Sequence, residues 1–257
     1  MPEPETPVGK YMYCIIRSPE PREFKTRGIG ERSDIVHTIH FRDLAAVVSD
    51  SPVVEYESSR RNMMAHTLVL EEVMREFTIL PVRFDTVAPS GAEAIQEKVL
   101  KRRFGEFHGL LQGMEGRVEL GLKAFWYEDI IFREIVEENP PIRHLRDSLM
   151  DRRPEETYYE RIRLGEMIEN AMWKKRDEDG ERILARLRPL VYQTRGNKLV
   201  TDRMALNAAF LVDEARQGEF DEVVKGIDEE MGKRFIFKYV GPVPPYNFVN
   251  IVVTWED

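Results

Sequence analysis

The stretch that most constrains this chain is Gly-Pro-Val-Pro-Pro-Tyr-Asn-Phe, residues 241–248, which lies between two apolar runs near the end of the sequence. A proline ring fixes the backbone angle φ and removes an amide donor, so no helix and no central strand can run through Pro242, Pro244 or Pro245. We therefore predict that this segment, the proline motif, is an extended corner between two strands. It is either a purely structural corner or a platform that binds a partner.

The composition is that of an ordinary globular protein, with 257 residues of which 42% are hydrophobic and 33% are charged. A chain of this length can bury one large core or two smaller ones. The single cysteine, Cys14, cannot form an intrachain disulfide, which favours the reducing cytoplasm. No apolar run approaches the roughly 18 residues of a membrane span, and residues 1–10 lack the plan of a signal peptide. We expect a protein that is neither secreted nor membrane-spanning.

The formal net charge of −8 argues against binding to nucleic acid, which depends on contacts from Lys and Arg to phosphates. Short basic clusters occur, but each has acidic residues close by. Such mixed clusters are typical of solvated helix faces.

The first half of the chain predicts the order β-ββ-α-β-α-β. Residues 10–16 are apolar on both parities, which predicts a central strand covered on both faces, and residues 17–34 indicate a long connection. The remaining elements are a hairpin over 34–49, a helix with an apolar stripe from Met63 to Phe77, an edge strand around Pro81, a helix from Leu100 to Met114, and an alternating strand over 118–126. This order resembles a ferredoxin-like sandwich whose first helix is replaced by a loop.

The second half predicts a long helix followed by two strands, a helix, a strand and a tail. Residues 128–155 are acidic and are interrupted by Pro140 and Pro141, and the long helix starts near Tyr158. Residues 174–182 contain no apolar side chain, so we expect that part of the helix to lie in solvent. The last apolar run, 248–253, predicts a final strand.

We therefore predict an α+β protein of two domains. Residues 1–127 form the ferredoxin-like domain, and residues 128–257 form a second α+β domain with the long helix and the proline motif. In this second domain we expect Tyr246 and Phe248 to dock into the core while the prolines preset the turn.

The sequence offers no catalytic, cofactor-binding or metal-binding set. His37 and His40 are three apart on a predicted strand, so their side chains point to opposite faces and cannot share an ion. His66 lies on an apolar helix stripe and is predicted to be a hydrogen-bonded core histidine, and Cys14 is predicted to be an inert buried thiol. The Gly28-Ile29-Gly30 stretch lacks a third glycine and does not open a helix after a strand, so it is not a dinucleotide loop.

Several stretches together resemble the gas vesicle protein F/L family. They are residues 11–16, 44–49, 79–84 with 118–126, and 206–213 leading to the proline motif, so that the resemblance covers nearly the whole chain. In the proline motif the residues that match the family pattern are Gly241, Pro242, Pro244, Pro245, Tyr246 and Phe248. Val243 and Asn247 stand where the family usually has Trp and Ser, and Asp85 stands where it tends to have Gly.

The resemblance implies a non-enzymatic accessory or minor structural protein that needs no cofactor. Its expected partners are the small, very apolar major shell protein of the gas vesicle and other accessory proteins, and its expected location is the gas vesicle in the cytoplasm. The matched motif residues would be structural or would contact the partner. Two other functions stay open: an enzyme that uses an open ferredoxin-like sheet, and a regulatory module that binds a metabolite.

Overall fold

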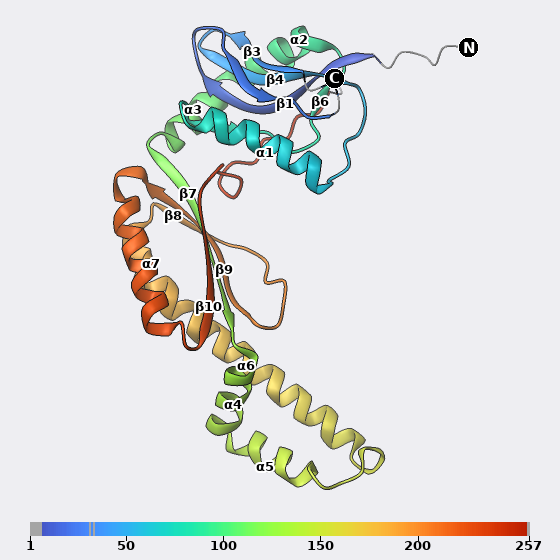
Figure 1. Cartoon of the computed structure of the whole chain (residues 1–257), viewed down its shortest axis with the longest axis vertical. Coiled ribbons are helices and arrows are strands. Elements are labelled where there is room, and N and C mark those ends of the chain that lie inside the picture. Colours follow the sequence, from blue (N-terminus) through green and yellow to red (C-terminus); the bar gives the residue numbers. More distant parts are fainter. Residues whose placement is uncertain (1–6, 31, 33, 256–257) are drawn as a thin grey trace, which may run out of the picture. The chain divides into compact units, whose positions relative to one another are not determined.

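The computed structural model describes residues 7–30, 32 and 34–255, and the chain divides into two compact units. Unit 1 comprises Met1–Glu119 and Pro242–Asp257, and unit 2 comprises Leu120–Gly241. Unit 2 is therefore an insertion between two segments of unit 1 (Figure 1). The sequence predicted a single boundary after residue 127, with the C-terminal segment in the second domain. In the structure that segment packs with unit 1 instead, because its residues Val249 and Ile251 are buried there.

Unit 1 contains one antiparallel sheet in the order β2-β3-β4-β1-β5, with β6 also paired to β1. Its strands are β1 (Val8–Arg17), β2 (Glu23–Arg27), β3 (Ile35–Phe41), β4 (Leu44–Pro52), β5 (Ile79–Pro81) and β6 (Val87–Ala88). Its helices are α1 (Arg60–Met74), α2 (Gly91–Ala94), a π-helical stretch (Ile95–Lys101) and α3 (Phe104–Met114). The side chain of Ser59 caps α1 by accepting a hydrogen bond from the Asn62 amide at 3.2 Å.

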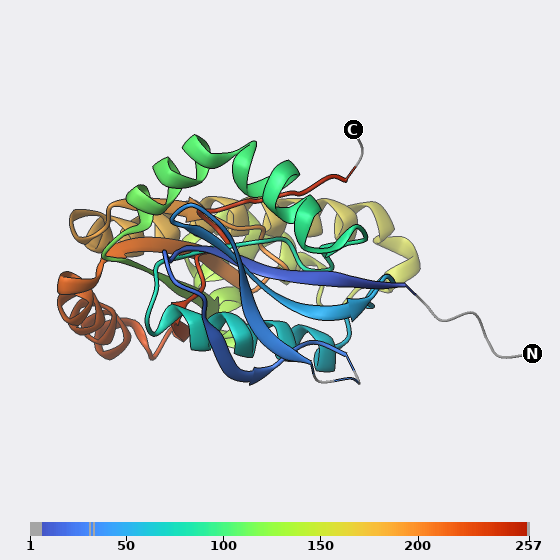
Figure 2. The same ribbon diagram turned by 90° about the horizontal axis from the view of Figure 1, so that it is seen from above.

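Strand β1 is the centre of the unit 1 core, as the sequence predicted. Every residue from Tyr11 to Ile16 is fully buried. Figure 2 shows why, since α1 lies on one side of the strands and the α2–α3 region on the other. A bulge between Met12 and Cys14 shifts the register of β1 against β4. The predicted hairpin is β3 and β4, and the strand with Pro81 is β5, at the end of the sheet where a missing amide donor costs least.

Strand β2 lies within residues 17–34, where the sequence indicated only a connection. It is a five-residue edge strand with alternating exposed side chains, so it carries no apolar run that reveals it. The carboxylate of Glu72, on α1, accepts hydrogen bonds from the backbone amides of Lys25 and Thr26 at 2.9 and 2.7 Å. These two donors are therefore not free to pair with another strand.

Unit 2 is built on a sheet in the order β10-β7-β9-β8. Its strands are β7 (Arg117–Trp126), β8 (Gln193–Gly196), β9 (Met204–Asp213) and β10 (Phe235–Val243). Its helices are α4 (Glu128–Glu138), α5 (Pro140–Leu149), α6 (Tyr158–Leu187) and α7 (Gln217–Met231), with 3₁₀ turns at Pro154–Glu156, Arg188–Leu190 and Glu214–Arg216. The predicted alternation of β7 is confirmed, since Leu120, Leu122, Ala124 and Trp126 are all fully buried. The strand nevertheless belongs to this sheet and not to the first one.

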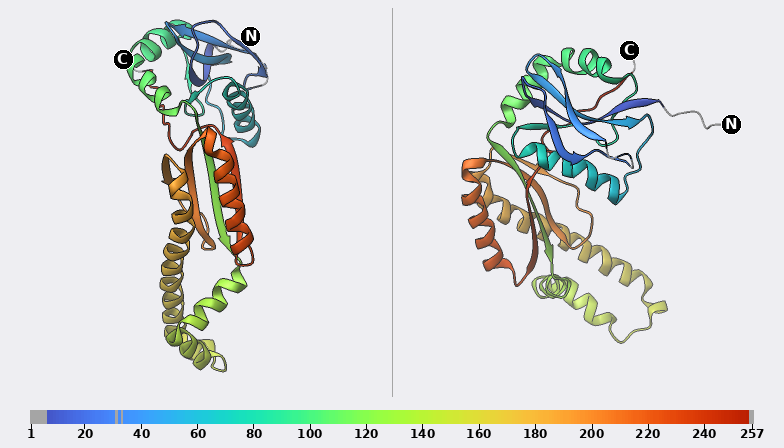
Figure 3. Two further views of the ribbon diagram at one scale, coloured as in Figure 1. Left: turned by 90° about the vertical axis from the view of Figure 1, so that its left-hand side faces the viewer. Right: turned by 45° about the horizontal axis from the view of Figure 1, so that its top comes forward.

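The long helix α6 has 30 residues and extends past the sheet, where it packs with α4 and α5 (Figure 3). We call α4, α5 and the first half of α6 the helical arm. The expectation that residues 174–182 lie in solvent is wrong at its centre, because Asp179 and Gly180 are buried. Gly180 has no side chain, which allows the helix to approach the backbone of Ala205 closely.

The final strand predicted over 248–253 does not form. Only Ile251 makes a bridge, parallel to Val82, and its carbonyl accepts a hydrogen bond from the Arg83 amide at 3.1 Å. The two prolines before it and the turn at 246–248 leave too few residues in register for a ladder. The expected α+β class, with a helix-covered N-terminal sheet and a long C-terminal helix, is confirmed. Within the described residues, no helix combines the length and the apolar character that a bilayer span requires.

Candidate functional site

The proline motif begins inside the edge strand β10 and ends in a tight turn of unit 1. Gly241 has a φ of 137°, a backbone conformation that L side chains rarely adopt. Both Gly241 and Pro242 are exposed, whereas Pro244 and Pro245 are buried. Beyond them the backbone turns, with the amide of Tyr246 donating to the Pro244 carbonyl at 2.7 Å. The prolines thus redirect the chain into unit 1.

The sequence predicted that the two aromatic residues of the motif dock into the core of the second domain. In the structure they do not. They lie in unit 1, where Phe248 is half-buried and Tyr246 is 44% exposed. Burial of the Tyr246 hydroxyl, opposed by its hydrogen bond with Thr67, raises its pKa to about 12. The anchors of this segment are instead Val249 and Ile251, which are both buried.

Asn247, between those two aromatic residues, bonds to a buried carboxylate. Its backbone amide donates to Glu119 Oε2 at 2.9 Å, and its side-chain Nδ2 donates to Glu119 Oε1 at 2.5 Å. The Glu119 residue is 2% exposed, and burial raises its pKa although the two bonds from Asn247 oppose that shift. A buried charge needs such partners, and here they come from the far end of the chain.

His66 is a core histidine, as predicted. It is 1% exposed, and its Nδ1 lies 3.0 Å from the Tyr11 hydroxyl. That hydroxyl also accepts a hydrogen bond from the Asp85 amide at 3.1 Å. Among the described residues, Nε2 has no hydrogen-bond partner, and the ring lies close to those of Tyr13 and Phe84. Burial lowers the pKa of His66 to about 4.

Asp85 has a φ of 65°, in the left-handed region that glycine adopts without strain. This conformation explains why a glycine would suit the position. The aspartate is tolerated because its Oδ1 accepts a hydrogen bond from the Tyr56 amide at 2.8 Å.

The other candidate residues are each engaged separately. His37 contacts Lys10 and the Ile35 carbonyl, and His40 contacts Thr38 Oγ1 at 2.7 Å. Cys14 is buried, and burial raises the pKa of its thiol. In the part of the chain that the structure describes, no group of three or more His, Cys, Asp or Glu side chains is placed to hold a metal ion.

Sequence reasoning missed an ion network inside unit 2. Arg234 donates two hydrogen bonds to the Glu134 carboxylate at 2.6 and 2.7 Å, and a third to Asp179 at 2.6 Å. Asp179 also accepts from Trp126 Nε1 at 2.8 Å, and Lys175 donates to Glu134 at 3.0 Å. The one sign of this network in the sequence was the pair Asp179 and Gly180, which lies inside the polar stretch 174–182 of the long helix. Such a pattern is usual for a solvated face.

Charges within this network determine its pKa values. Burial opposes ionisation of Glu134, but hydrogen bonds from Arg234 and Lys175 outweigh it and lower the pKa of Glu134. Burial likewise disfavours the charged guanidinium of Arg234, but its bonds to Glu134 and Asp179 raise its pKa. The network therefore stays charged and joins α4 and α6 to the start of β10.

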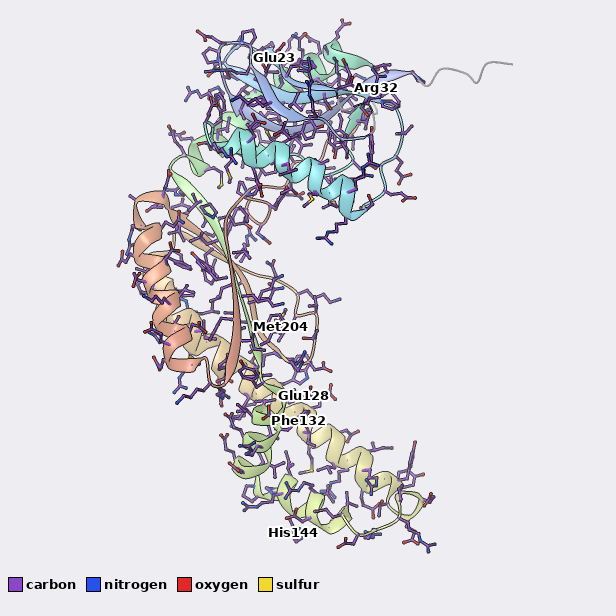
Figure 4. All side chains as sticks on the ribbon, in the orientation of Figure 1. Glu23, Arg32, Glu128, Phe132, His144 and Met204 are labelled. Atoms are coloured by element: carbon purple, nitrogen blue, oxygen red, sulfur yellow. The ribbon has the colours of Figure 1, made fainter. Side chains whose placement is uncertain are left out.

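A groove of about 580 Å³ lies between α4 and α6 in unit 2. We call it the arm groove. It is lined by Glu128, Ile131, Phe132, Gly165, Ile168, Glu169, Met172, Trp173, Arg176 and residues 201–203. Figure 4 marks Glu128 and Phe132, which lie near the start of α4. The floor residues Ile131 and Met172 are buried, whereas Phe132 is 40% exposed and Trp173 is 58% exposed.

A second, larger groove of about 1300 Å³ lies in unit 1 beside the C-terminal segment. Its lining is mixed: apolar side chains such as Val53, Met63 and Phe84 alternate with charged ones, namely Glu55, Glu57, Arg83 and Asp85. Both of these grooves thus combine apolar and charged side chains in their walls.

The comparisons with known proteins agree over nearly the whole chain. A family described as gas vesicle synthesis protein GvpL/GvpF matches residues 9–250. Gas vesicle protein F of Microcystis aeruginosa is 27% identical over 247 residues, covering 95% of this chain and 99% of that protein. Gas vesicle protein F1 of Halobacterium salinarum is 29% identical over 251 residues, and the match covers 96% of this chain and 95% of the Halobacterium protein.

The fold is similar to that of a solved relative as well. The crystal structure of the gas vesicle protein GvpF from Anabaena sp. PCC7120 superposes with a TM-score of 0.82 at 26% identity, covering 96% of this chain and all of that one. Sequence motifs, family match and fold therefore point the same way. This chain belongs to the gas vesicle protein GvpL/GvpF family.

Proposed function

We propose that this protein acts in gas vesicle assembly by binding the hydrophobic major shell protein, without catalysing a reaction. A shell subunit must keep a large apolar surface from aggregating until it joins the vesicle wall. A partner that covers this surface and then releases it would meet that need. Family membership supports a role connected with gas vesicles.

One observation carries the binding role: several large apolar side chains are exposed on the helical arm or directly beside it. They are Phe132, Met150, Tyr158, Tyr159, Ile162 and Trp173. Tyr159 is 80% exposed, and it lies on the same helix as Ile162 and Trp173. Phe132 and Trp173 line the same groove, and exposed apolar surface of this kind is typical of sites of protein interaction. By contrast, the buried titratable groups His66, Glu119 and Asp179 are held in packing and hydrogen bonds, which supports binding over catalysis.

The test uses the whole purified protein and purified shell protein kept monomeric in mild detergent. On dilution of the detergent, the shell protein alone should scatter light as it aggregates, and a stoichiometric amount of this protein should suppress the scattering. Serum albumin at equal mass serves as the control for non-specific protection. No suppression, together with no binding heat in calorimetry with or without detergent, would contradict the proposal.

Within this function we assign the proline motif a structural role. Replacing Pro244 and Pro245 by alanine gives the unfolded chain more freedom and should lower the free energy of unfolding by about 1–2 kcal/mol. Binding of the shell protein should be unchanged when it is measured about 20 °C below the melting temperature of the variant, because the variant is then still folded. A stable variant that fails to bind would instead make the motif a contact surface.

A further inference from the structure

We propose that the arm groove binds an amphipathic α-helix of the partner, with an apolar stripe and a Lys or Arg at its edge. The identity of that partner rests on the proposed function, whereas the kind of segment bound is inferred from the groove itself. The proposed occupant is a helix and not an extended strand, for the reasons that follow.

The length of the groove matches a short helix. Along α6 it extends from Gly165 to Arg176, which is about 16 Å at a rise of 1.5 Å per residue. That length corresponds to about three helical turns, enough for apolar anchors at spacings of three and four residues. Ile168 and Met172 have this spacing on α6 and form the apolar surface that such anchors would contact.

Gly165 gives a bound helix room to approach closely. A Cβ placed on Gly165 would meet no atom within 4 Å, so open space lies over this position. Glycine weakens the interior of a helix relative to alanine, and packing inside this chain does not require it here. An approaching backbone would use the space that a side chain would otherwise fill.

The walls of the groove are held in place before any partner binds. The guanidinium of Arg176 lies over the ring of Trp173 at 5.5 Å, and its Nη2 donates to the Asp202 carbonyl at 2.9 Å. An exposed Trp held in this way is typical of binding hot spots.

The charges at the groove favour a basic edge on the partner. Glu128 and Glu169 both line it, both are exposed, and neither forms an ion pair with another described residue. Asp202 is a third acidic residue in the lining, against two arginines, Arg176 and Arg203. Arg176 is engaged with Trp173 and with a backbone carbonyl, whereas Arg203 is exposed. A Lys or Arg flanking the apolar stripe of the occupant would pair with the two free carboxylates.

A strand is the less suitable occupant. Both long walls are helices whose backbone groups are used internally, so they offer no ladder of donors and acceptors to an extended chain. Side-chain anchors must therefore supply the binding energy, as in the recognition of a helix by an apolar groove.

The experiment uses a variant that fills the groove without straining the protein. Gly165→Leu should leave melting temperature unchanged or raised, because leucine favours a helix more than glycine does. It should weaken binding of the shell protein by about tenfold or more, since the new side chain occupies the approach space. The matched control is Gly109→Leu in the middle of α3, where a Cβ likewise meets nothing within 4 Å; it should bind as the unaltered protein does.

A synthetic helix separates this inference from the proposed function. The probe is a labelled peptide with leucines at helical spacing and flanking lysines, and its control is a peptide of the same composition in which leucine and lysine alternate as in a strand. We expect anisotropy to show binding of the first peptide only, together with a blue shift of Trp173 emission that Trp173→Phe removes. Glu128→Lys with Glu169→Lys should reduce that binding.

The outcomes distinguish the two claims. If the unaltered protein binds the shell protein and Gly165→Leu binds it equally well, the groove assignment is overturned and the proposed function stands. If the shell protein does not bind but the helical peptide does, in a manner sensitive to Gly165→Leu, the proposed function fails and the groove remains a helix site. Equal binding of both peptides overturns the choice of a helix.

Discussion

The imidazole of His66 combines near-complete burial with one hydrogen bond and aromatic neighbours. Sequence alone identified it as a core residue, because it follows the apolar stripe of its helix. The partner, Tyr11, was not predictable, since it lies 55 residues away on a strand whose register is set by a bulge. Which residues enter a core is readable from periodicity, whereas which pairs meet depends on the tertiary register.

Burial of His66 makes stability depend on pH. The folded pKa is about 4, below the ordinary value of 6.5, so the folded state binds fewer protons than the unfolded state between these two values. The contribution of the neutral ring is complete above pH 6.5 and is lost as the pH falls through 4. It amounts to about 3 kcal/mol. Urea unfolding at pH 7, 5 and 4 should show His66→Gln losing less stability than the unaltered protein.

His144 provides the matched control, because it is exposed on α5. His144→Gln should retain the full pH dependence of the unaltered protein. Equal slopes for the His66 and His144 variants would show that His66 does not titrate as proposed.

The bond between Asn247 and Glu119 gives a second prediction at this scale. Asn247→Ala removes one of two donors to a buried carboxylate and should cost about 1–3 kcal/mol of unfolding free energy. Because burial already raises the pKa of Glu119 and the lost bond favours its charged form, the loss should be greater at pH 7 than at pH 4. Chemical denaturation at both pH values measures the difference.

Asn250→Ala, at an exposed asparagine three residues later, should leave stability unchanged at both pH values. Adding Glu119→Gln to Asn247→Ala should recover part of the loss at pH 7, because the neutral amide needs no ionic partner. Failure of this rescue would show that the loss comes from the turn and not from the carboxylate.

At the scale of elements, prediction from sequence succeeded where burial leaves a pattern. The two-faced strand β1, the alternating strand β7 and the long helix α6 each showed the periodicity that their packing requires. It failed for β2, whose side chains alternate in exposure without an apolar run, and for the end of the chain, where an apolar run packs without forming a ladder. It also placed β7 in the wrong sheet, because alternation does not specify a strand's neighbour.

The ion network shows how an element that looks solvated can hold a unit together. Arg234→Met would leave Asp179, a buried acid, without its cationic partner, so we expect a loss of about 3–5 kcal/mol. Arg234→Lys should restore part of it, since a single ammonium cannot reproduce the paired bonds to Glu134. Thermal and urea unfolding at neutral pH measure these differences.

Arg188→Met is the matched control, since Arg188 also forms paired bonds to a carboxylate, that of Glu181, but at an exposed position. Exposed pairs contribute little because water and salt screen them, so this variant should be close to the unaltered protein. A small effect of Arg234→Met would mean that the network is dispensable.

At the scale of the whole molecule, unit 1 needs both ends of the chain. Removing residues 242–257 takes away Val249 and Ile251 from its core and the donors to Glu119. We expect the truncated protein to lose hydrogen-exchange protection in β1 and β5, while α7 in unit 2 keeps its protection. Mass spectrometry of the exchanged peptides measures both regions in one experiment.

A synthetic peptide of residues 242–257, added to the truncated protein, should restore protection in β1 and β5. Equal loss of protection in both units, or no loss in either, would contradict this account of the chain division.

The insertion of unit 2 into unit 1 also has a consequence for synthesis on the ribosome. The first 119 residues leave the exit tunnel early, yet the segment that completes their core is translated last. A chain that stops early therefore carries an incomplete unit 1, in which Glu119 lacks the two hydrogen bonds that Asn247 donates to its carboxylate. Such nascent fragments would be recognisable to proteases, so the order of translation itself screens out incomplete copies of this protein.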